Sequence, residues 1–326
     1  MTKLKIGVLG AGHLGKIHLR CIQQANERYE LVGFFDADVA NAAKVADQFN
    51  ISAFDSVEAL IEAVDVVDVV TPTIHHFSVA KAAILRGRHV FIEKPLTHTV
   101  SEAEALLALT RQKGVKVQVG HVERFNPAFL SLGDISIEPL FIEAHRLAPF
   151  NPRGTDVSVI LDLMIHDIDL ILHLVKSEVK AIHASGVAVV SASPDIANAR
   201  IEFENGCVAN LTASRMSLKQ MRKVRFFQRD AYLSLDFLEK NAQIIRLLDA
   251  NTEGGELMEM DTARGKKWID IKMPEPMAVN AIQLELETFA DSIVQNTEPK
   301  VTIEDGYRAL KIAHRIIEVI GDTTLS

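Results

Sequence analysis

The stretch GAGHLG, residues 10–15, decides the fold of this chain because of the segments that surround it. An apolar run at residues 6–9 precedes it and predicts a strand, while residues 14–25 follow it with the pattern of a helix. A second apolar run, residues 31–35, ends on Asp36. Strand, glycine turn, helix, strand and acid in this order are typical of a Rossmann dinucleotide-binding unit.

Each glycine of the stretch has a separate physical task. Gly10 allows the tight turn out of the strand, Gly12 leaves room for a pyrophosphate against the backbone, and Gly15 lets the helix pack closely. The phosphates then accept hydrogen bonds from backbone amides at the helix N-terminus, where His13 and Leu14 lie. We therefore predict that all five residues bind the cofactor.

Asp36 indicates which dinucleotide is bound. A carboxylate about 20 residues beyond the last glycine accepts the ribose hydroxyls of NAD and repels the 2′-phosphate of NADP. No Lys or Arg lies between Asp36 and Lys44 to neutralise that phosphate. The sequence therefore predicts NAD as the cofactor.

The composition indicates a globular protein of about two domains. The chain has 326 residues, 48% of them hydrophobic, which is enough for a large core. A net charge of −8 at pH 7 argues against a nucleic acid or an acidic membrane surface as partner. Cys21 and Cys207 lie far apart without metal or redox spacing, so we expect buried thiols in a reducing, cytoplasmic environment.

The pattern of predicted elements changes once along the chain, near residue 121. Up to that point strands and helices alternate, which indicates an α/β, doubly wound parallel sheet covered on both faces. Beyond it, longer runs alternate only partly, and Asn205-Gly206 joins two of them as a hairpin signal. We predict a Rossmann domain over residues 1–121 and a C-terminal α+β domain, with a mostly antiparallel open sheet, over residues 122–326. The second domain is expected to bind substrate and to form the oligomer.

Polar residues follow two strands of the predicted parallel sheet. Glu93 and Lys94, in the sequence EKP, come directly after one strand, and Thr71 and Pro72 end another, with His76 close behind. Ligands of open α/β sheets bind beyond the carboxyl ends of the strands, so we predict these five residues at the cofactor cleft. A charged turn is the alternative interpretation of Glu93 and Lys94, and their position alone does not decide between the two.

A polar stripe runs along the apolar helix predicted for residues 160–175. Asp162, His166, Asp169 and His173 fall within an arc of about 60° at roughly 100° per residue of a regular helix. Burying polar groups on a helix costs free energy unless they are hydrogen-bonded, ion-paired or part of a functional site. A structural network is the alternative to a functional site, and it applies more readily to Asp169 and His173 than to the first two residues.

These motifs together resemble the Gfo/Idh/MocA oxidoreductases over nearly the whole chain. The resemblance rests on GAGHLG, TPTIHH at residues 71–76, EKP at residues 93–95, D-x-x-x-H at Asp162 and His166, and the closing segment EDGYRALKIAHRIIEVI. It implies an NAD-dependent dehydrogenase acting on CH–OH groups, in which Lys94, Asp162 and His166 are catalytic and line the sugar site beside the nicotinamide. It also implies a homodimer or homotetramer.

Two longer segments are similar to one branch of that family, the UDP-N-acetylglucosamine 3-dehydrogenases. They are GHVERFNPAF at residues 120–129 and DVSVILDLMIHDIDLIL at residues 156–172. The similarity implies oxidation of a sugar or nucleotide-sugar secondary alcohol, such as the 3-hydroxyl of UDP-N-acetylglucosamine. Arg124 and Arg153 are then candidates for binding the diphosphate, because guanidinium groups suit phosphate, and surface or structural ion pairs are the alternative. Asp162 and His166 are candidates for contacting the sugar.

Chemistry assigns provisional roles to the three catalytic candidates. His166 is the predicted general base, since an ordinary histidine pKa near 6.5 suits proton removal at neutral pH. Asp162 orients His166 or binds a neighbouring hydroxyl, and Lys94 stabilises negative charge on the reacting oxygen. Whether Lys94 or His166 takes the proton stays open.

Three other functions compete with this prediction. A dehydrogenase of a free sugar or an inositol would use the same residues. A metal-dependent lyase or hydrolase would use the acids and histidines as ligands, but the ammonium of Lys94 would repel a cation, so we predict no metal. A non-catalytic NAD-binding sensor would have little need for Lys94, Asp162 and His166 together.

Overall fold

The chain folds into two compact units, each described here by itself. The computed structural model describes residues 3–151, 157–249, 257–262 and 265–324. The first unit combines Met1–Val122 with Val279–Lys311, and the second combines Glu123–Ala278 with Ile312–Ser326. No helix within the described ranges combines the length and the apolar character that crossing a membrane demands.

The first unit is built on a parallel five-stranded sheet in the order β2-β1-β3-β4-β5. The strands are β1 (Leu4–Leu9), β2 (Tyr29–Phe35), β3 (Val66–Val69), β4 (His89–Glu93) and β5 (Val117–Gly120). The helices are α1 (His13–Gln24), α2 (Val39–Phe49), α3 (Val57–Ala63), α4 (Thr73–Leu85), α5 (Val100–Lys113), α8 (Ala281–Val294) and the first half of α9 (Ile303–Thr324). The predicted parallel Rossmann sheet is confirmed.

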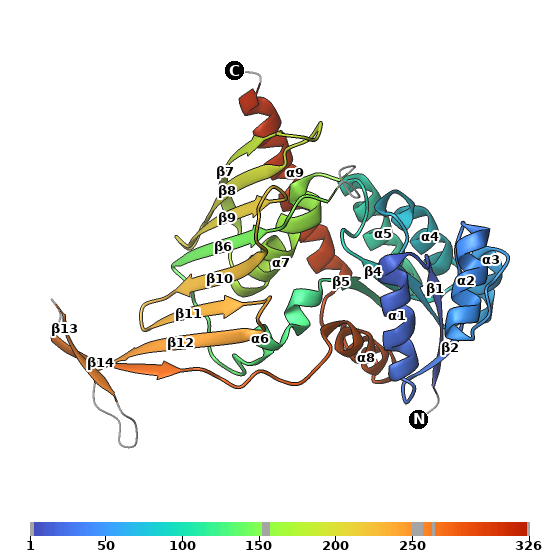
Figure 1. Ribbon diagram of the computed structural model, residues 1–326, viewed down its shortest axis with the longest axis horizontal. Coiled ribbons are helices and arrows are strands. Elements are labelled where there is room, and N and C mark those ends of the chain that lie inside the picture. The colour runs from blue at the N-terminus through green and yellow to red at the C-terminus, as the bar shows by residue number, and fades with distance from the viewer. Residues whose placement is uncertain (1–2, 152–156, 250–256, 263–264, 325–326) are drawn as a thin grey trace. The chain divides into compact units, whose positions relative to one another are not determined.

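Helices cover both faces of this sheet, as successive residues of β1 demonstrate. Ile6 and Val8 are fully buried in a core that α1 and α8 complete (Figure 1). Gly7, between them, points to the other face, where an added Cβ would lie 2.7 Å from the side chain of Leu60 in α3. Continuous burial along β3 and β5 follows from this double cover.

The division of the chain differs from a single boundary at residue 121. Helix α8 and the first turns of α9 come late in the sequence but belong to the first unit. Leu286 and Phe289 of α8 are fully buried in its core, and the Phe289 ring packs against Phe91 of β4, tilted by 60° with ring centroids 6.2 Å apart. The apolar face of α8 therefore sets its place, which sequence order did not indicate.

The second unit is a nine-stranded sheet in the order β13-β14-β12-β11-β10-β6-β9-β8-β7 (Figure 1). Its strands are β6 (Phe141–Leu147), β7 (Val179–Val187), β8 (Ile196–Phe203), β9 (Val208–Ser214), β10 (Met221–Phe227), β11 (Ala231–Asp236), β12 (Asn241–Leu248), β13 (Met258–Thr262) and β14 (Gly265–Lys272). Every pairing is antiparallel except β6 with β9. The predicted mostly antiparallel sheet is confirmed.

The Asn205-Gly206 signal lies where it was predicted, between β8 and β9. Gly206 has φ +86°, a conformation that glycine adopts without strain. Alternate residues of the central strands are buried, as in the pattern of β6, because only one face of each strand packs on the core. Two short helices, η1 (Val122–Phe125) and α6 (Pro127–Leu130), precede β6.

The helix predicted for residues 160–175 is not uniform. It begins with a π-helical turn, η2 (Ile160–Met164), and continues as the regular helix α7 (Ile165–Leu174). A π turn is wider than an α turn, so the arc calculated for a regular helix does not apply to Asp162. Such turns are frequent at functional sites.

Candidate functional site

The glycine turn has the geometry that its sequence requires. Gly10 has φ +95°, and a Cβ there would lie 2.7 Å from the carbonyl oxygen of Val70. A Cβ on Gly15 would lie 2.0 Å from the carbonyl oxygen of Gly10, so only glycine lets α1 approach the turn. Around Gly12 nothing lies within 4 Å of the added atom. The turn is therefore tight at its ends and open in its middle.

The N-terminus of α1 is suited to an anion. Gly12 is its N-cap residue, and no side chain caps the helix. The first amides of a helix have no partners inside the helix and carry partial positive charge. His13 is exposed and Leu14 half-buried at this end. These features fit a pyrophosphate, as the sequence indicates.

Asp36 follows β2 and braces the glycine turn. Its Oδ2 accepts from the amide of Ala11 at 2.7 Å and from Nδ2 of Asn41 at 3.2 Å, while Oδ1 accepts from the amide of Asp38 at 2.9 Å. A carboxylate oxygen has two lone pairs, so Oδ1 retains capacity for a hydroxyl donor. The carboxylate is held beside the turn in a fixed orientation.

His76 joins two strand ends of the parallel sheet. Its ring nitrogens lie 2.9 Å from the carbonyl oxygens of Thr71 and Pro95. The side chain is buried, and burial lowers the pKa of His76, so the neutral ring donates its single N–H to one of these oxygens and only contacts the other. His76 thus holds the loops that carry Thr71, Pro72 and Lys94 together, a bracing contact that its predicted position at the cleft did not reveal.

Glu93 and Lys94 end β4 at the carboxyl edge of the sheet. Glu93 is buried and Lys94 is half-buried. The Glu93 Oε2 accepts from the backbone amide of Lys94 at 3.1 Å. The Thr71 hydroxyl, on the neighbouring strand end, is buried and has no hydrogen-bond partner among the described residues. Together with the N-terminus of α1, which no side chain caps, this edge of the sheet fits the NAD that is predicted to bind there.

Sequence reasoning missed two residues behind this edge, His18 and Asp68. His18 of α1 lies between the carboxylates of Asp68 and Glu93, and both new residues are fully buried. A signal was available, because Asp68 interrupts the apolar run VVDVV and a lone charge in a buried strand needs a partner.

In the second unit, Asp162 lies in η2 and His166 in the first turn of α7, and both are half-buried. Asp162 lines a cavity of about 420 Å³ together with Asn151, Arg215 and Gln220. Arg215 was not among the predicted residues. Its side chain is buried, and Nη2 donates to the carbonyl oxygen of Val157 at 2.6 Å.

The remaining residues of the polar stripe form an ion-pair network. Arg124 donates to both carboxylate oxygens of Asp169, at 2.8 and 2.6 Å, and its Nη1 lies 3.1 Å from Nδ1 of His173. The side chains of Arg124 and Asp169 are 5% and 1% exposed. This arrangement favours the structural alternative for all three. Arg153 lies outside the described residues.

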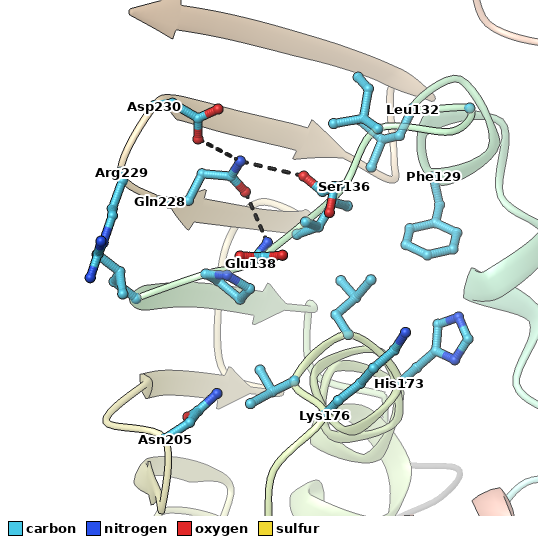
Figure 2. A pocket seen from close by; sticks show the side chains of 17 residues that line it. Phe129, Leu132, Ser136, Glu138, His173, Lys176, Asn205, Gln228, Arg229 and Asp230 are labelled. Atoms are coloured by element: carbon cyan, nitrogen blue, oxygen red, sulfur yellow. Dashed lines mark hydrogen bonds between the residues drawn. The ribbon is translucent and has the colours of Figure 1, made fainter.

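A large hollow of the second unit is separate from Asp162 and His166. It encloses about 1180 Å³ at the C-terminal end of α7, and Gln228 bridges its rim to Ser136 and Glu138 (Figure 2). Its charged rim residues have both signs and are exposed: Glu138, Lys176, Arg229 and Asp230. Size alone therefore does not make it the site. Within the described ranges, no three His, Cys, Asp or Glu side chains converge as metal ligands.

Comparison with known proteins identifies the family of both units. Residues 4–121 match the family described as "Oxidoreductase family, NAD-binding Rossmann fold", and residues 139–229 match the GFO/IDH/MocA C-terminal domain. The chain is 42% identical over 245 residues to UDP-N-acetylglucosamine 3-dehydrogenase of Acidithiobacillus ferrooxidans, covering 75% of this chain and 77% of that protein. It is 28% identical to scyllo-inositol 2-dehydrogenase (NAD(+)) of Bacillus subtilis, covering 66% and 68%.

Solved structures give the same result over the whole chain. The crystallised A. ferrooxidans UDP-N-acetylglucosamine 3-dehydrogenase has a TM-score of 0.88 at 35% identity and covers 99% of both chains. A levoglucosan dehydrogenase, solved with NADH and L-sorbose, has a TM-score of 0.84 at 19% identity, which indicates a shared fold. The predictions of the family and of NAD as cofactor are confirmed. The chain belongs to the GFO/IDH/MocA family of NAD-binding oxidoreductases.

Proposed function

We propose that this chain oxidises the 3-hydroxyl of UDP-N-acetylglucosamine to a ketone, with NAD as the electron acceptor. The observation that carries the proposal is the 42% identity to a UDP-N-acetylglucosamine 3-dehydrogenase, joined to a structural match over 99% of both chains. The inositol dehydrogenases among the relatives are less similar, at 25% to 31% identity. Their substrates are also secondary alcohols, so the class of reaction is common to all of them.

The first unit supplies the cofactor site in this proposal. The pyrophosphate is bound by backbone amides from Gly12 to Gly15, where no side chain caps the helix. Asp36 accepts the ribose hydroxyls, and its charge rejects a 2′-phosphate. Thr71, Pro72 and Glu93 shape the edge beside the nicotinamide. His76 acts indirectly, through its contacts with the strand-end loops.

Lys94, Asp162 and His166 carry the chemistry in this proposal. NAD, when bound, accepts the hydride from the sugar carbon. His166 takes the hydroxyl proton as general base, and Asp162 orients His166 or binds an adjacent hydroxyl. Lys94 donates a hydrogen bond to the reacting oxygen and stabilises its developing negative charge. The products are the ketone, NADH and one proton, so the reaction balances without a metal.

A substrate panel tests the proposal. The purified chain is mixed with NAD, and NADH absorbance is followed with UDP-N-acetylglucosamine, UDP-glucose, N-acetylglucosamine and myo-inositol. We expect the highest kcat/KM with UDP-N-acetylglucosamine. A higher value with myo-inositol would overturn the proposal in favour of a free polyol. Binding of NADH without turnover of any sugar would favour a sensor.

Oligomeric state, location and the diphosphate-binding residues complete the proposal. Self-association into a dimer or tetramer and a cytoplasmic location stay predictions from the sequence. Arg124 and Arg153 also stay predictions for the diphosphate, and the engagement of Arg124 by Asp169 and His173 counts against the first of them.

A further inference from the structure

A buried histidine connects two acids at the carboxyl edge of the first sheet. The Nδ1 of His18 lies 2.9 Å from Oδ2 of Asp68, and its Nε2 lies 3.1 Å from Oε1 of Glu93. The side chains of His18 and Asp68 are fully buried, and that of Glu93 is 10% exposed. The three residues come from α1, β3 and β4, so the cluster joins three elements behind the strand end.

The charges of this cluster follow from its contacts. Burial lowers the pKa of His18, but the charges and hydrogen bonds of Asp68 and Glu93 outweigh burial and hold the pKa well above its ordinary value. Both ring nitrogens therefore donate, each to one carboxylate. For Glu93, burial raises the pKa, but the bond to His18 and the charges of His18 and Lys94 outweigh it. Glu93 is thus an anion held by a cation.

The two oxygens of Glu93 face in two directions. Oε1 accepts from His18, while Oε2 accepts from the backbone amide of Lys94 at 3.1 Å. The backbone of β5 also limits the carboxylate, because a Cβ on Gly120 would lie 2.9 Å from Oε1. Rotation of the carboxylate would break at least one of these contacts, so its orientation depends on His18.

One further acid faces the cluster, Glu285 of α8. Burial raises the pKa of Glu285 well above its ordinary value, and the neighbouring Glu93 raises it further. Burial thus favours the uncharged, protonated form of Glu285, which does not compete with Glu93 for the charge of His18. The only carboxylates that His18 contacts among the described residues are those of Asp68 and Glu93.

We propose that His18 and Glu93 are positioning residues for Lys94. His18, anchored on Asp68, fixes the Glu93 carboxylate so that it accepts from the Lys94 amide and thereby sets the backbone from which the Lys94 side chain extends. This inference rests on the proposed role of Lys94 in the reaction. Neither residue needs to touch the substrate.

Two substitutions at one position separate positioning from stability. The amide nitrogen of Asn reaches about as far as Nδ1 of histidine, and that of Gln about as far as Nε2. His18→Asn therefore keeps a donor for Asp68 and frees Glu93, whereas His18→Gln keeps a donor for Glu93 and frees Asp68. Each variant leaves one buried carboxylate without its donor, so both are expected to lose similar stability.

We measure kcat per NADH-binding site, the Kd of NADH and the hydrogen-exchange rate of the Lys94 amide in both variants. In His18→Asn, kcat falls about 10- to 100-fold, the cost of a misplaced catalytic group. The Lys94 amide exchanges about tenfold faster, as expected for loss of a bond to a charged acceptor. His18→Gln keeps at least tenfold more turnover than His18→Asn. The Kd of NADH changes less than twofold in both variants.

Two variants of Glu93 test the proposal if the His18 variants do not fold. Glu93→Ala removes the acceptor of the Lys94 amide, whereas Glu93→Gln keeps an amide oxygen that accepts from it. Turnover and Lys94 exchange are expected to recover in Glu93→Gln relative to Glu93→Ala.

The proposal would be overturned if the two His18 variants lost turnover equally and showed the same Lys94 exchange, and the two Glu93 variants did likewise. The cluster would then have only a structural role. If the wild-type chain oxidises no sugar, the proposed function fails. The exchange rate of the Lys94 amide then still decides the positioning inference, because it needs no substrate.

Discussion

At the scale of single residues, Asp36 links the cofactor to one carboxylate. Its oxygens are bound by the amides of Ala11 and Asp38, so the charge stays beside the glycine turn. We expect kcat/KM with NAD to exceed that with NADP, because a 2′-phosphate would meet this charge. Asp36→Ala should bring the kcat/KM values for NAD and NADP closer together. Equal use of both cofactors by the wild-type chain would show that Asp36 does not select.

His166 is the residue with the sharpest predicted effect on chemistry. His166→Asn should lower kcat by about 10²–10⁴-fold, the usual contribution of a positioned general base. NADH affinity and melting temperature should change little, because His166 is half-buried in the first turn of α7 and not in the core. The wild-type rate should fall toward acidic pH as the general base takes up a proton, and this fall should be absent in His166→Asn. Unchanged turnover with the same pH profile would leave Lys94 as the base.

At the scale of elements, one buried arginine joins η1, β6 and α7. Arg146 donates to Glu123 at 2.7 Å and to both carboxylate oxygens of Asp167 at 3.0 and 2.8 Å, and all three side chains are at most 4% exposed. Arg146→Met should cost about 3–5 kcal/mol of unfolding free energy, because it removes the cation that both buried carboxylates contact and, among the described residues, leaves Glu123 only Arg222, at 4.0 Å.

The matched control for Arg146 lies on the next strand. Arg225 of β10 pairs with Glu143 at 3.4 Å, but its side chain is 45% exposed. Arg225→Met should cost about 0–1 kcal/mol, as is usual for surface pairs. Urea unfolding of both variants measures the difference. Similar losses would show that burial of the Arg146 cluster is not what stabilises these elements.

A buried acid on helix α8, Glu285, should make the stability of the chain depend on pH. Both carboxyl oxygens of Glu285 are buried and have no hydrogen-bond partner among the described residues, and burial raises its pKa well above the ordinary value. The folded chain keeps a proton that the unfolded chain releases above about pH 4.3, so stability falls as pH rises toward the folded pKa.

Glu285→Gln removes this dependence, because its amide cannot ionise. The variant should be as stable as the wild type near pH 5 and more stable near pH 8, measured by chemical unfolding at both values. Glu287→Gln on the same helix is the control, since Glu287 is only half-buried and accepts from Gln283. A difference that does not grow with pH would mean that Glu285 is not protonated in the folded chain.

At the scale of the whole molecule, the first unit needs a segment from late in the chain. Helix α8 contributes Leu286 and Phe289 to the core, and each such side chain is worth about 1.5–3 kcal/mol when buried. A fragment of residues 1–122 should therefore lack cooperative urea unfolding, because typical domains have only about 5–15 kcal/mol in total. Adding residues 279–311 through a flexible linker should restore it. Cooperative unfolding of the short fragment would show that α8 is dispensable.

Residues that are close in sequence were predicted well, and residues that meet across the fold were not. The parallel sheet, the glycine turn and the Asn205-Gly206 hairpin depend on short stretches whose backbone preferences are local. The π turn at Asp162 was missed, because apolar spacing does not distinguish a π turn from an α turn over five residues. The site residues Lys94, Asp162 and His166 came from motifs, and their roles stay predictions.

The sequence by itself determined the Rossmann sheet, the glycine turn and the NAD-binding family. These follow from hydrophobic periodicity, the φ freedom of glycine and the position of Asp36, all of which act within a few tens of residues. Tertiary structure alone decided that His18 meets Asp68 and Glu93, 50 and 75 positions away, and that α8 completes the first core. It also decided that Arg124 is bound by Asp169. Charge pairing and core packing act through space, so separation along the chain does not reveal them.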